Sequence, residues 1–351
     1  MPSVLHVFDS DISPSALGQM NVIVGRREGD VLARVGRPGE GGDLPRPREI
    51  VRLFWGWKPA CGPQLRELAD RHGCGTIHCW SEALAGPAAG SGTPTLLSLF
   101  APPRPRTMRR LRWAARHGAT ILACSQALAN TLAGMGLPTE AIRVVSPAAN
   151  PVDRRPEARQ DARRRLGLSD DQVVLLAPRQ TPLCRGMLWP IWGMAIVRQI
   201  IPNIRLILGG FGPAVQRRAR FAGMAGFAEE TILPPPGTDP QLFWSAADIV
   251  TLFDDSYGLP QYAQAVAAGV PVVACRAGDL GETLVDGQTA LLVPPGKPRA
   301  ISQALWRLCN DPALARHLVA TATAQWADRI SPAAVISQLD QLRQQPAAVC
   351  D

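Results

Sequence analysis

Lysine is nearly missing from this chain of 351 residues. Lys58 and Lys297 are the only two, so the formal net charge of +8 rests almost wholly on arginine. Genome composition explains such a bias as well as function does, and the charge alone therefore assigns no partner. The apolar fraction of 46% is ordinary for a globular protein, and a chain of this length predicts two domains.

Closely spaced metal ligands are also missing. The eight cysteines are scattered, with no CxxC pair and no cluster of histidines beside them, which argues against a structural zinc site. No basic start followed by a long apolar run is visible, and the most apolar window, 186–197, is interrupted by Pro190. We expect a cytoplasmic protein with reduced thiols, no signal peptide and no metal.

Short apolar or β-branched runs alternate with helix-like stretches along the chain. Such alternation predicts βα units and parallel sheets. The first series of expected strands is Val4–Phe8, Val51–Phe54, Thr76–Cys79, Thr95–Phe100, Thr120–Cys124 and Arg143–Val145. The second series is Gln172–Ala177, Arg205–Gly209, Thr231–Leu233, Ile249–Phe253, Val270–Ala274 and Ala290–Val293.

A polar stretch at 151–164, dense in acids and arginines, separates the two series. It predicts an exposed junction between an N-terminal domain, 1–155, and a C-terminal domain, 165–328. We expect residues 329–351 to form a helix that packs back on the N-terminal domain. Two α/β halves facing a cleft would place ligands at the carboxyl ends of their strands.

Arginine and glycine turns follow the strands of the second half. Arg179 and Arg185 flank the turn after 172–177, and a helix opens at Gly186. Two guanidinium groups near a helix N-terminus suit a diphosphate, although surface arginines in an arginine-rich chain explain the same pattern. Gly210 and Gly212 permit a tight turn after 205–209, but Val215 replaces the third glycine of a dinucleotide fingerprint.

A third turn, "DDSYGLP", follows the strand expected at 249–253. Gly258 lets the backbone approach a ligand, and the next helix directs its N–H groups back toward this loop. Asp255 is suited to accept hydrogen bonds from sugar hydroxyls, or alternatively to cap the helix. The segment "GDLGETLVDGQTALLVPPG" then supplies Glu282 beside another glycine turn.

Three blocks together resemble a known family. They are "ILACSQALANTLAGMGLPTEAIRVVSPAANPVD", "VVLLAPRQTPLCRGMLWPIWGMAIVRQIIPNIRLILGGFGP" and "AADIVTLFDDSYGLPQYAQAVAAGVPVVACRAGDLGETLVDGQTALLVPPGKP". Over about residues 118–325 the chain resembles the family 4 glycosyltransferases, retaining enzymes of the GT-B fold. The resemblance implies an α/β protein of two Rossmann-like domains facing a cleft, with a nucleotide-sugar donor in the C-terminal domain and no metal or cofactor. It implies a glycan, lipid-linked or small-molecule acceptor on the N-terminal domain and a role in cell-envelope polysaccharide biosynthesis.

The resemblance also assigns residues. Arg179 and Arg185 neutralise the departing diphosphate, Asp255 orients the sugar, and Gly210 and Gly212 form the turn of the nucleotide site. Further donor contacts are expected from Tyr257, Gly258, Leu259, Gln264 and Glu282.

Three positions depart from the family pattern, and the first is Asp255, which stands where the family has a glutamate that contacts the donor sugar. Ala263 replaces the glutamate that holds the ribose, and Gln264 is adjacent but lies about 100° around the helix. The loss of one charged hydrogen bond costs roughly 1.5–3 kcal/mol. The histidine expected after 95–100 is missing; His78 and Ser15 are acceptor-side candidates, and His78 equally suits packing at a strand end. A non-catalytic relative that binds nucleotide, glycan or a partner enzyme is the alternative function.

A basic segment, "PPRPRTMRRLRWAARHG", precedes the strand at 120–124. On a helix, Arg109, Arg112 and Arg116 share one face beside Trp113. Such a face predicts peripheral contact with an anionic membrane, or else a solvated helix surface. No motif for nucleic-acid binding accompanies the charge, so nucleic acid is not an expected partner.

Overall fold

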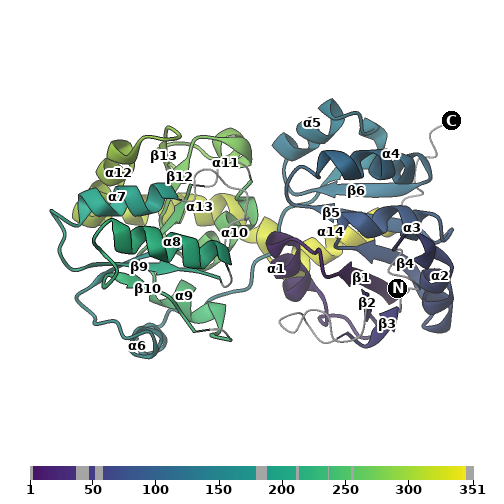
Figure 1. Cartoon of the computed structure of the whole chain (residues 1–351), viewed down its shortest axis with the longest axis horizontal. Helices are drawn as coiled ribbons and strands as arrows, with labels where there is room; N and C mark the ends of the chain where they lie inside the picture. The colour runs from purple at the N-terminus through teal and green to yellow at the C-terminus, as the bar shows by residue number, and fades with distance from the viewer. Residues whose placement is uncertain are drawn as a thin grey trace. The chain divides into compact units, whose positions relative to one another are not determined.

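The computed structural model describes residues 3–36, 47–51, 58–178, 188–210, 213–235, 237–253 and 257–344. The chain divides into two compact units. The first contains residues 1–148 and 332–351, and the second contains residues 149–331. Each unit is built on one sheet of parallel strands with helices around it (Figure 1). The expected fold class, α/β with two Rossmann-like domains, is therefore confirmed.

The described strands of the first unit form a sheet in the order β3-β2-β1-β4-β5-β6-β7. Its strands are β1 (Ser3–Asp9), β2 (Val31–Val35), β3 (Glu49–Val51), β4 (Cys74–Cys79), β5 (Thr95–Leu99), β6 (Ala119–Ala123) and β7 (Ile142–Val144). Its helices are α1 (Pro14–Ile23), α2 (Gly62–Arg71), α3 (Ala85–Ala89), α4 (Met108–Arg116), α5 (Gln126–Gly134) and α14 (Pro332–Gln344).

Strand β2 was not predicted. Its sequence, "VLARV", carries Arg34 among the apolar residues, which breaks the apolar run that marks a buried strand. In the structure the Arg34 side chain is only 8% exposed. The expected strand at Val51–Phe54 corresponds to β3, whose described residues end at Val51.

The second unit has the strand order β10-β9-β8-β11-β12-β13 among its described residues. Its strands are β8 (Val173–Ala177), β9 (Ile204–Leu208), β10 (Thr231–Ile232), β11 (Ile249–Leu252), β12 (Val272–Cys275) and β13 (Leu291–Val293). Its helices are α6 (Pro156–Arg165), α7 (Trp189–Val197), α8 (Pro213–Met224), α9 (Pro240–Ala246), α10 (Leu259–Ala267), α11 (Gly278–Thr283), α12 (Pro298–Asn310) and α13 (Pro312–Ile330). Each strand predicted in this half is present.

Helices on both faces explain the continuous apolar runs of these strands. On β8, Leu175 packs into one apolar cluster and Leu176 into another on the opposite face. Because successive side chains point to opposite faces of a sheet, a strand covered on both sides has no polar face. The same arrangement buries Val250 on one side of β11 and Ile249 on the other.

A buried arginine ties the amino ends of β8 and β11 together. Arg163 on α6 is fully buried, and its guanidinium donates to Asp248 Oδ2 at 2.6 Å. It also donates to the carbonyl oxygens of Ala246, Ser169, Asp170 and Gln172. Asp248 precedes β11 and accepts further bonds from the Arg159 guanidinium and the Val174 N–H.

The C-terminal helix α14 belongs to the first unit, where it contacts α1 (Figure 1). Gln338 donates to the Val144 carbonyl at 3.3 Å, and Arg27 forms an ion pair with Asp340 at 2.5 Å. Within the described ranges, no helix combines the length and apolar character needed to cross a membrane.

Candidate functional site

The sheet of the second unit reverses its strand order between β8 and β11. Strands β9 and β10 lie on the β8 side, and β12 and β13 lie on the β11 side. In open parallel sheets, ligands bind beyond the carboxyl ends of the strands at such a reversal. The loops that follow β8, β9, β11 and β12 all leave from this edge, and these loops carry the predicted donor residues.

Four predicted residues lie outside the described parts of the chain: Arg179, Arg185, Gly212 and Asp255. The described residues show where their loops begin. Pro178 follows β8, Gly210 follows shortly after β9, and Phe253 follows β11 directly. The roles of the four residues stay predictions.

Gly210 has a conformation that requires glycine. Its φ of 92° lies in the left-handed region, where a side chain would be strained. The neighbouring Gly209 N–H donates to the Ala177 carbonyl at 2.8 Å, which joins this turn to the end of β8. The glycine turn and the β8 loop therefore start side by side.

The start of α10 is closed by a buried carboxylate. Asp279 is fully buried and accepts hydrogen bonds from the Gly258 N–H at 2.8 Å and the Leu259 N–H at 3.2 Å. Pro260 has no N–H, and the next two N–H groups along the helix donate to the Gly258 carbonyl. The interpretation that these N–H groups face a ligand is thus corrected, because the protein itself satisfies them.

Packing accounts for glycine at position 258. A Cβ built there would lie 2.8 Å from Leu280 Cδ1, too close for a real contact. Leu280 and Asp279 both belong to α11, so this short helix covers the start of α10. Sequence reasoning missed Asp279 because its partners are 20 and 21 residues away. No local pattern marks such a capping pair.

Ala263, which stands where the family has its second glutamate, lies in the apolar core. Its side chain is fully buried, beside Tyr262, whose hydroxyl donates to the Thr289 carbonyl at 3.2 Å. Gln264 is the next residue along the helix. Its Nε2 donates to the Asn150 carbonyl at 2.8 Å and its Oε1 accepts from the Asn150 N–H at 3.2 Å. The donor contact of Gln264 stays a prediction, and in this structure its amide is bonded to the Asn150 backbone.

The remaining described donor candidates differ in exposure. Tyr257 is half-buried before α10, and the Leu259 side chain is buried at 2% exposure, so it contributes to packing. Glu282 is exposed on α11, which begins shortly after the carboxyl end of β12. Of these three, Glu282 offers a solvent-facing polar side chain at the expected edge.

The first unit has its own reversal, between β1 and β4. Ser15 lies in the first turn of α1, after the carboxyl end of β1, and is 7% exposed. Asp9 and Ser81, which were not predicted as site residues, lie at the end of β1 and just after β4. The Asp9 N–H donates to Ser81 Oγ at 3.2 Å, and its carboxylate accepts from the Asp11 N–H at 3.0 Å.

His78, next to the carboxyl end of β4, is enclosed by the protein. It is fully buried within the sheet layer, its Nε2 pairs with Ser98 Oγ at 2.8 Å, and its ring stacks on Trp80 with centroids 4.3 Å apart. Burial lowers the pKa of His78 well below its ordinary value of 6.5. These contacts favour the packing role that was its alternative, and an acceptor-side role for His78 stays a prediction.

A second buried histidine lies beside His78. His6 Nε2 pairs with Asp30 Oδ2 at 3.2 Å, and its Nδ1 accepts a hydrogen bond from Trp80 Nε1–H at 3.1 Å. Burial lowers the pKa of His6 as well. The described residues contain no cluster of three or more His, Cys, Asp or Glu side chains suited to a metal ion.

Two family models match the chain. Residues 18–152 match the model described as Glycosyltransferase Family 4, and residues 172–311 match the model described as Glycosyl transferases group 1. The chain belongs to the family 4, group 1 glycosyltransferases. A solved member of the same fold is the Anabaena protein HepE in complex with UDP, with a TM-score of 0.77 and 17% identity. That likeness covers 97% of this chain and 99% of HepE.

Curated relatives of this family 4 chain match it over part of their length. One is the GDP-mannose-dependent alpha-(1-6)-phosphatidylinositol monomannoside mannosyltransferase of Mycolicibacterium smegmatis, 31% identical over 167 residues. Another is a D-inositol 3-phosphate glycosyltransferase of Acidothermus cellulolyticus, 35% identical over 204 residues. The matches cover 45% and 54% of this chain, and 44% and 45% of the two relatives. The matched part therefore spans less than half the length of either relative.

Proposed function

We propose that this family 4 chain transfers a sugar from a nucleotide-sugar to an acceptor, with retention of configuration and without a metal ion or cofactor. One observation supports the proposal: strands β8, β9 and β11, which precede Arg179, Arg185, Gly210 and Asp255 in the sequence, end at the carboxyl edge where the strand order reverses. Two guanidinium groups there stabilise the charge that builds on the leaving diphosphate. Asp255 accepts hydrogen bonds from hydroxyls of the donor sugar, and Glu282 adds a carboxylate from α11.

The acceptor belongs to the first unit in this proposal. The edge beyond β1 and β4 carries Ser15, Asp9 and Ser81, which are polar groups of the kind that hold hydroxyls. A glycan, a lipid-linked sugar or a small polyol fits such a site. The names of the mannosyl and inositol phosphate relatives support a polyol-containing acceptor and a role in cell-envelope polysaccharides. Action in the cytoplasm belongs to the same proposal.

Calorimetric titration of UDP and GDP tests the donor site. Arg185→Ala is expected to weaken binding by roughly tenfold or more, the loss of one charged hydrogen bond. Arg307→Ala, which removes an exposed arginine from α12, is the matched control and should leave the affinity unchanged. If neither nucleotide binds the parent protein at millimolar concentration, the donor-site proposal fails.

A second candidate function has observations of its own. Ala263 is part of the core, the start of α10 is closed by Asp279, and His78 is buried. These features fit a family member that binds a nucleotide or glycan without transferring sugar. Measurable nucleotide binding with no release of nucleotide from UDP- and GDP-sugars, across a panel of acceptors, would favour this candidate over the transferase.

A further inference from the structure

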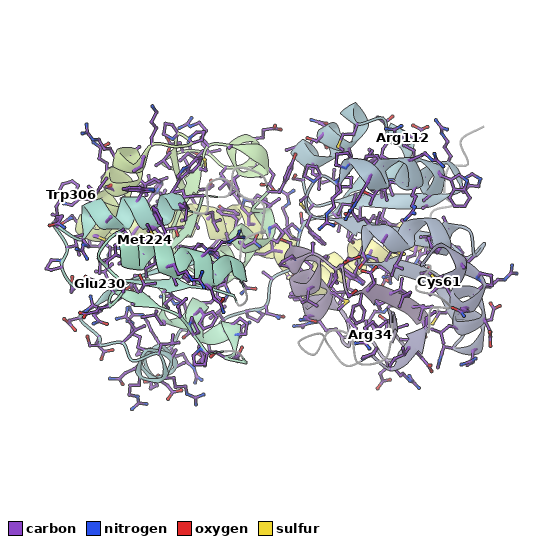
Figure 2. All side chains as sticks on the ribbon, viewed as in Figure 1. Arg34, Cys61, Arg112, Met224, Glu230 and Trp306 are labelled. Atoms are coloured by element: carbon purple, nitrogen blue, oxygen red, sulfur yellow. The ribbon has the colours of Figure 1, made fainter. Side chains whose placement is uncertain are left out.

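The first unit has a hollow on its surface between α3 and α4, with a volume of about 610 Å³. We name it the α4 pocket. Its α4 wall contains Arg109, Arg112, Trp113 and Arg116, and its α3 wall contains Gly86 and Gly90. The two helices contact each other (Figure 1), and Figure 2 labels Arg112. A hollow of this volume suits a small molecule.

Positive charge in the α4 pocket is not compensated. No acidic residue lines it, and among the described residues none of its arginines forms an ion pair. The pocket is lined by four arginines, Arg109, Arg110, Arg112 and Arg116, and all four are exposed side chains on α4. Arginine offers bidentate donors that match phosphate and carboxylate. An anion in this pocket would relieve the repulsion between the arginines.

The shape of the α4 pocket favours a discrete ring over a bare ion. Trp113 is 43% exposed, and one ring face is covered by His117 with centroids 4.0 Å apart. A Cβ built at Gly86 would meet nothing within 4 Å, and one built at Gly90 would lie 3.5 Å from the Trp113 ring. The indole edge therefore lies close to the Gly90 backbone, and the open part of the α3 wall is at Gly86.

A flat bilayer explains the pocket less well. Membrane-surface helices insert an apolar face into the acyl boundary. The apolar face of α4 is already used, since Met108, Leu111, Ala114 and Ala115 are buried in the protein. Trp113 is the one large apolar side chain that this helix leaves exposed.

We propose that the α4 pocket binds a phosphorylated sugar or polyol ring, with the ring against Trp113 and the phosphate on Arg109, Arg112 and Arg116. The ligand is either a free sugar phosphate or the headgroup of a lipid. The α4 pocket belongs to the first unit, whereas the proposed donor residues belong to the second unit.

Titration with glucose 6-phosphate, glucose and inorganic phosphate tests the proposal, with saturating UDP present. Glucose 6-phosphate is expected to bind at least about tenfold more tightly than either fragment, because only it engages both Trp113 and the arginines. If inorganic phosphate binds as tightly, the pocket is a simple anion site and the proposed ring contact is overturned. Saturating UDP fills the proposed donor site, so that glucose 6-phosphate cannot bind there. Repeating the titration without UDP then shows whether glucose 6-phosphate also binds at the donor site.

Two variants examine the two walls separately. Arg109→Gln with Arg116→Gln removes charge, and Gly86→Phe fills the hollow while keeping every charge. Gly86 lies on a helix without left-handed φ, so the backbone accepts phenylalanine there. Each variant is expected to weaken glucose 6-phosphate binding by about tenfold or more. Arg307→Gln with Arg316→Gln, two exposed arginines of the second unit, is the control of equal charge loss and should bind normally.

Vesicle flotation distinguishes a lipid headgroup from a free sugar phosphate as the ligand. It also tests the alternative that α4 binds a flat membrane surface. Flotation with phosphatidylinositol vesicles that Gly86→Phe abolishes would assign a lipid headgroup as the ligand. Glucose 6-phosphate binding without flotation would assign a free sugar phosphate. Flotation that requires Arg109 and Arg116 but tolerates Gly86→Phe, with no sugar phosphate binding, would overturn the proposal and show a flat electrostatic contact. If circular dichroism shows that Gly86→Phe does not fold, Trp113→Ala replaces it as the variant that tests the ring contact.

Discussion

The buried carboxylate of Asp279 accepts a 2.8 Å hydrogen bond from the Gly258 backbone N–H. This contact joins α11, after β12, to the start of α10, after β11. Two loops at the predicted donor edge are thereby held by one side chain. The loop geometry that a nucleotide-sugar would meet therefore depends on a residue that offers it no open oxygen in this structure.

Asp279→Ala should lower the free energy of unfolding by about 3 kcal/mol, because two buried N–H groups lose a charged acceptor. Urea unfolding followed by tryptophan fluorescence measures the change. Glu282→Ala removes an exposed carboxylate from the same helix and should stay within about 0.5 kcal/mol. Equal stability of the two variants would mean that water replaces Asp279 at no cost.

Ala263→Glu is expected to destabilise the second unit by about 3 kcal/mol or more, because it places a carboxylate in an apolar core. Ala267→Glu, at a half-buried position one turn further along α10, should cost less. Stronger UDP or GDP binding by Ala263→Glu with unchanged stability would show instead that the position faces the ribose, as in the family pattern.

Gln264→Ala removes both hydrogen bonds to the Asn150 backbone. We expect a loss of about 1–2 kcal/mol in stability, with nucleotide affinity unchanged. Calorimetry and thermal unfolding on the same preparation measure both quantities. A tenfold weaker nucleotide affinity at constant stability would show that Gln264 is a donor ligand.

Acid should destabilise the first unit through its buried histidines. The pKa values of His6 and His78 are lowered by burial, so the unfolded chain binds protons before the folded one as the pH falls. Their contribution to stability is complete above about pH 6.5 and decreases below it, by about 1.4 kcal/mol for each unit of pKa difference. Unfolding measured between pH 7.5 and about pH 5 should show a smaller slope in His78→Gln than in the parent. His317→Gln, at an exposed position, is the control.

Arg163→Lys should destabilise the second unit by about 3 kcal/mol or more, because an ammonium group cannot replace the five hydrogen bonds of the guanidinium. Arg164→Lys alters the exposed neighbour, which has one weak contact to Asp161 at 3.4 Å, and should be nearly neutral. Similar unfolding midpoints for both variants would contradict the role assigned to Arg163.

The strand pattern was largely predictable because strands covered on both faces give continuous apolar runs. Strand β2 was not predicted because Arg34 interrupts its run of apolar residues. Its pairing with β1 depends on tertiary contacts. The βα order also predicts the edge where ligands bind. The pattern of apolar runs and helices in the sequence therefore predicts the sheet, the helix layers on its two faces and the sheet edge where ligands bind.

Side-chain roles at that edge were less predictable. Gln264 is next to the family position in sequence, yet the helical rotation directs it toward Asn150. His78 occupies a strand end, and only the packing of Trp80 and Ser98 shows that it is enclosed. Asp279 gave no signal, since its partners come from a different βα unit. Contacts between distant segments decide these roles, and local spacing does not record them.

The Arg163 cluster stands at the amino ends of β8 and β11, whereas the donor loops leave their carboxyl ends. A unit so arranged anchors its strands at one edge of the sheet and varies its chemistry at the other. Away from Gly258, which Asp279 and Leu280 constrain, substitutions in the loops after β8 and β11 can then accumulate with little effect on folding, as surface loops generally allow. Exchange of these loops between relatives, with the Arg163–Asp248 pair kept intact, is thus a route to altered donor preference in a scaffold that still folds.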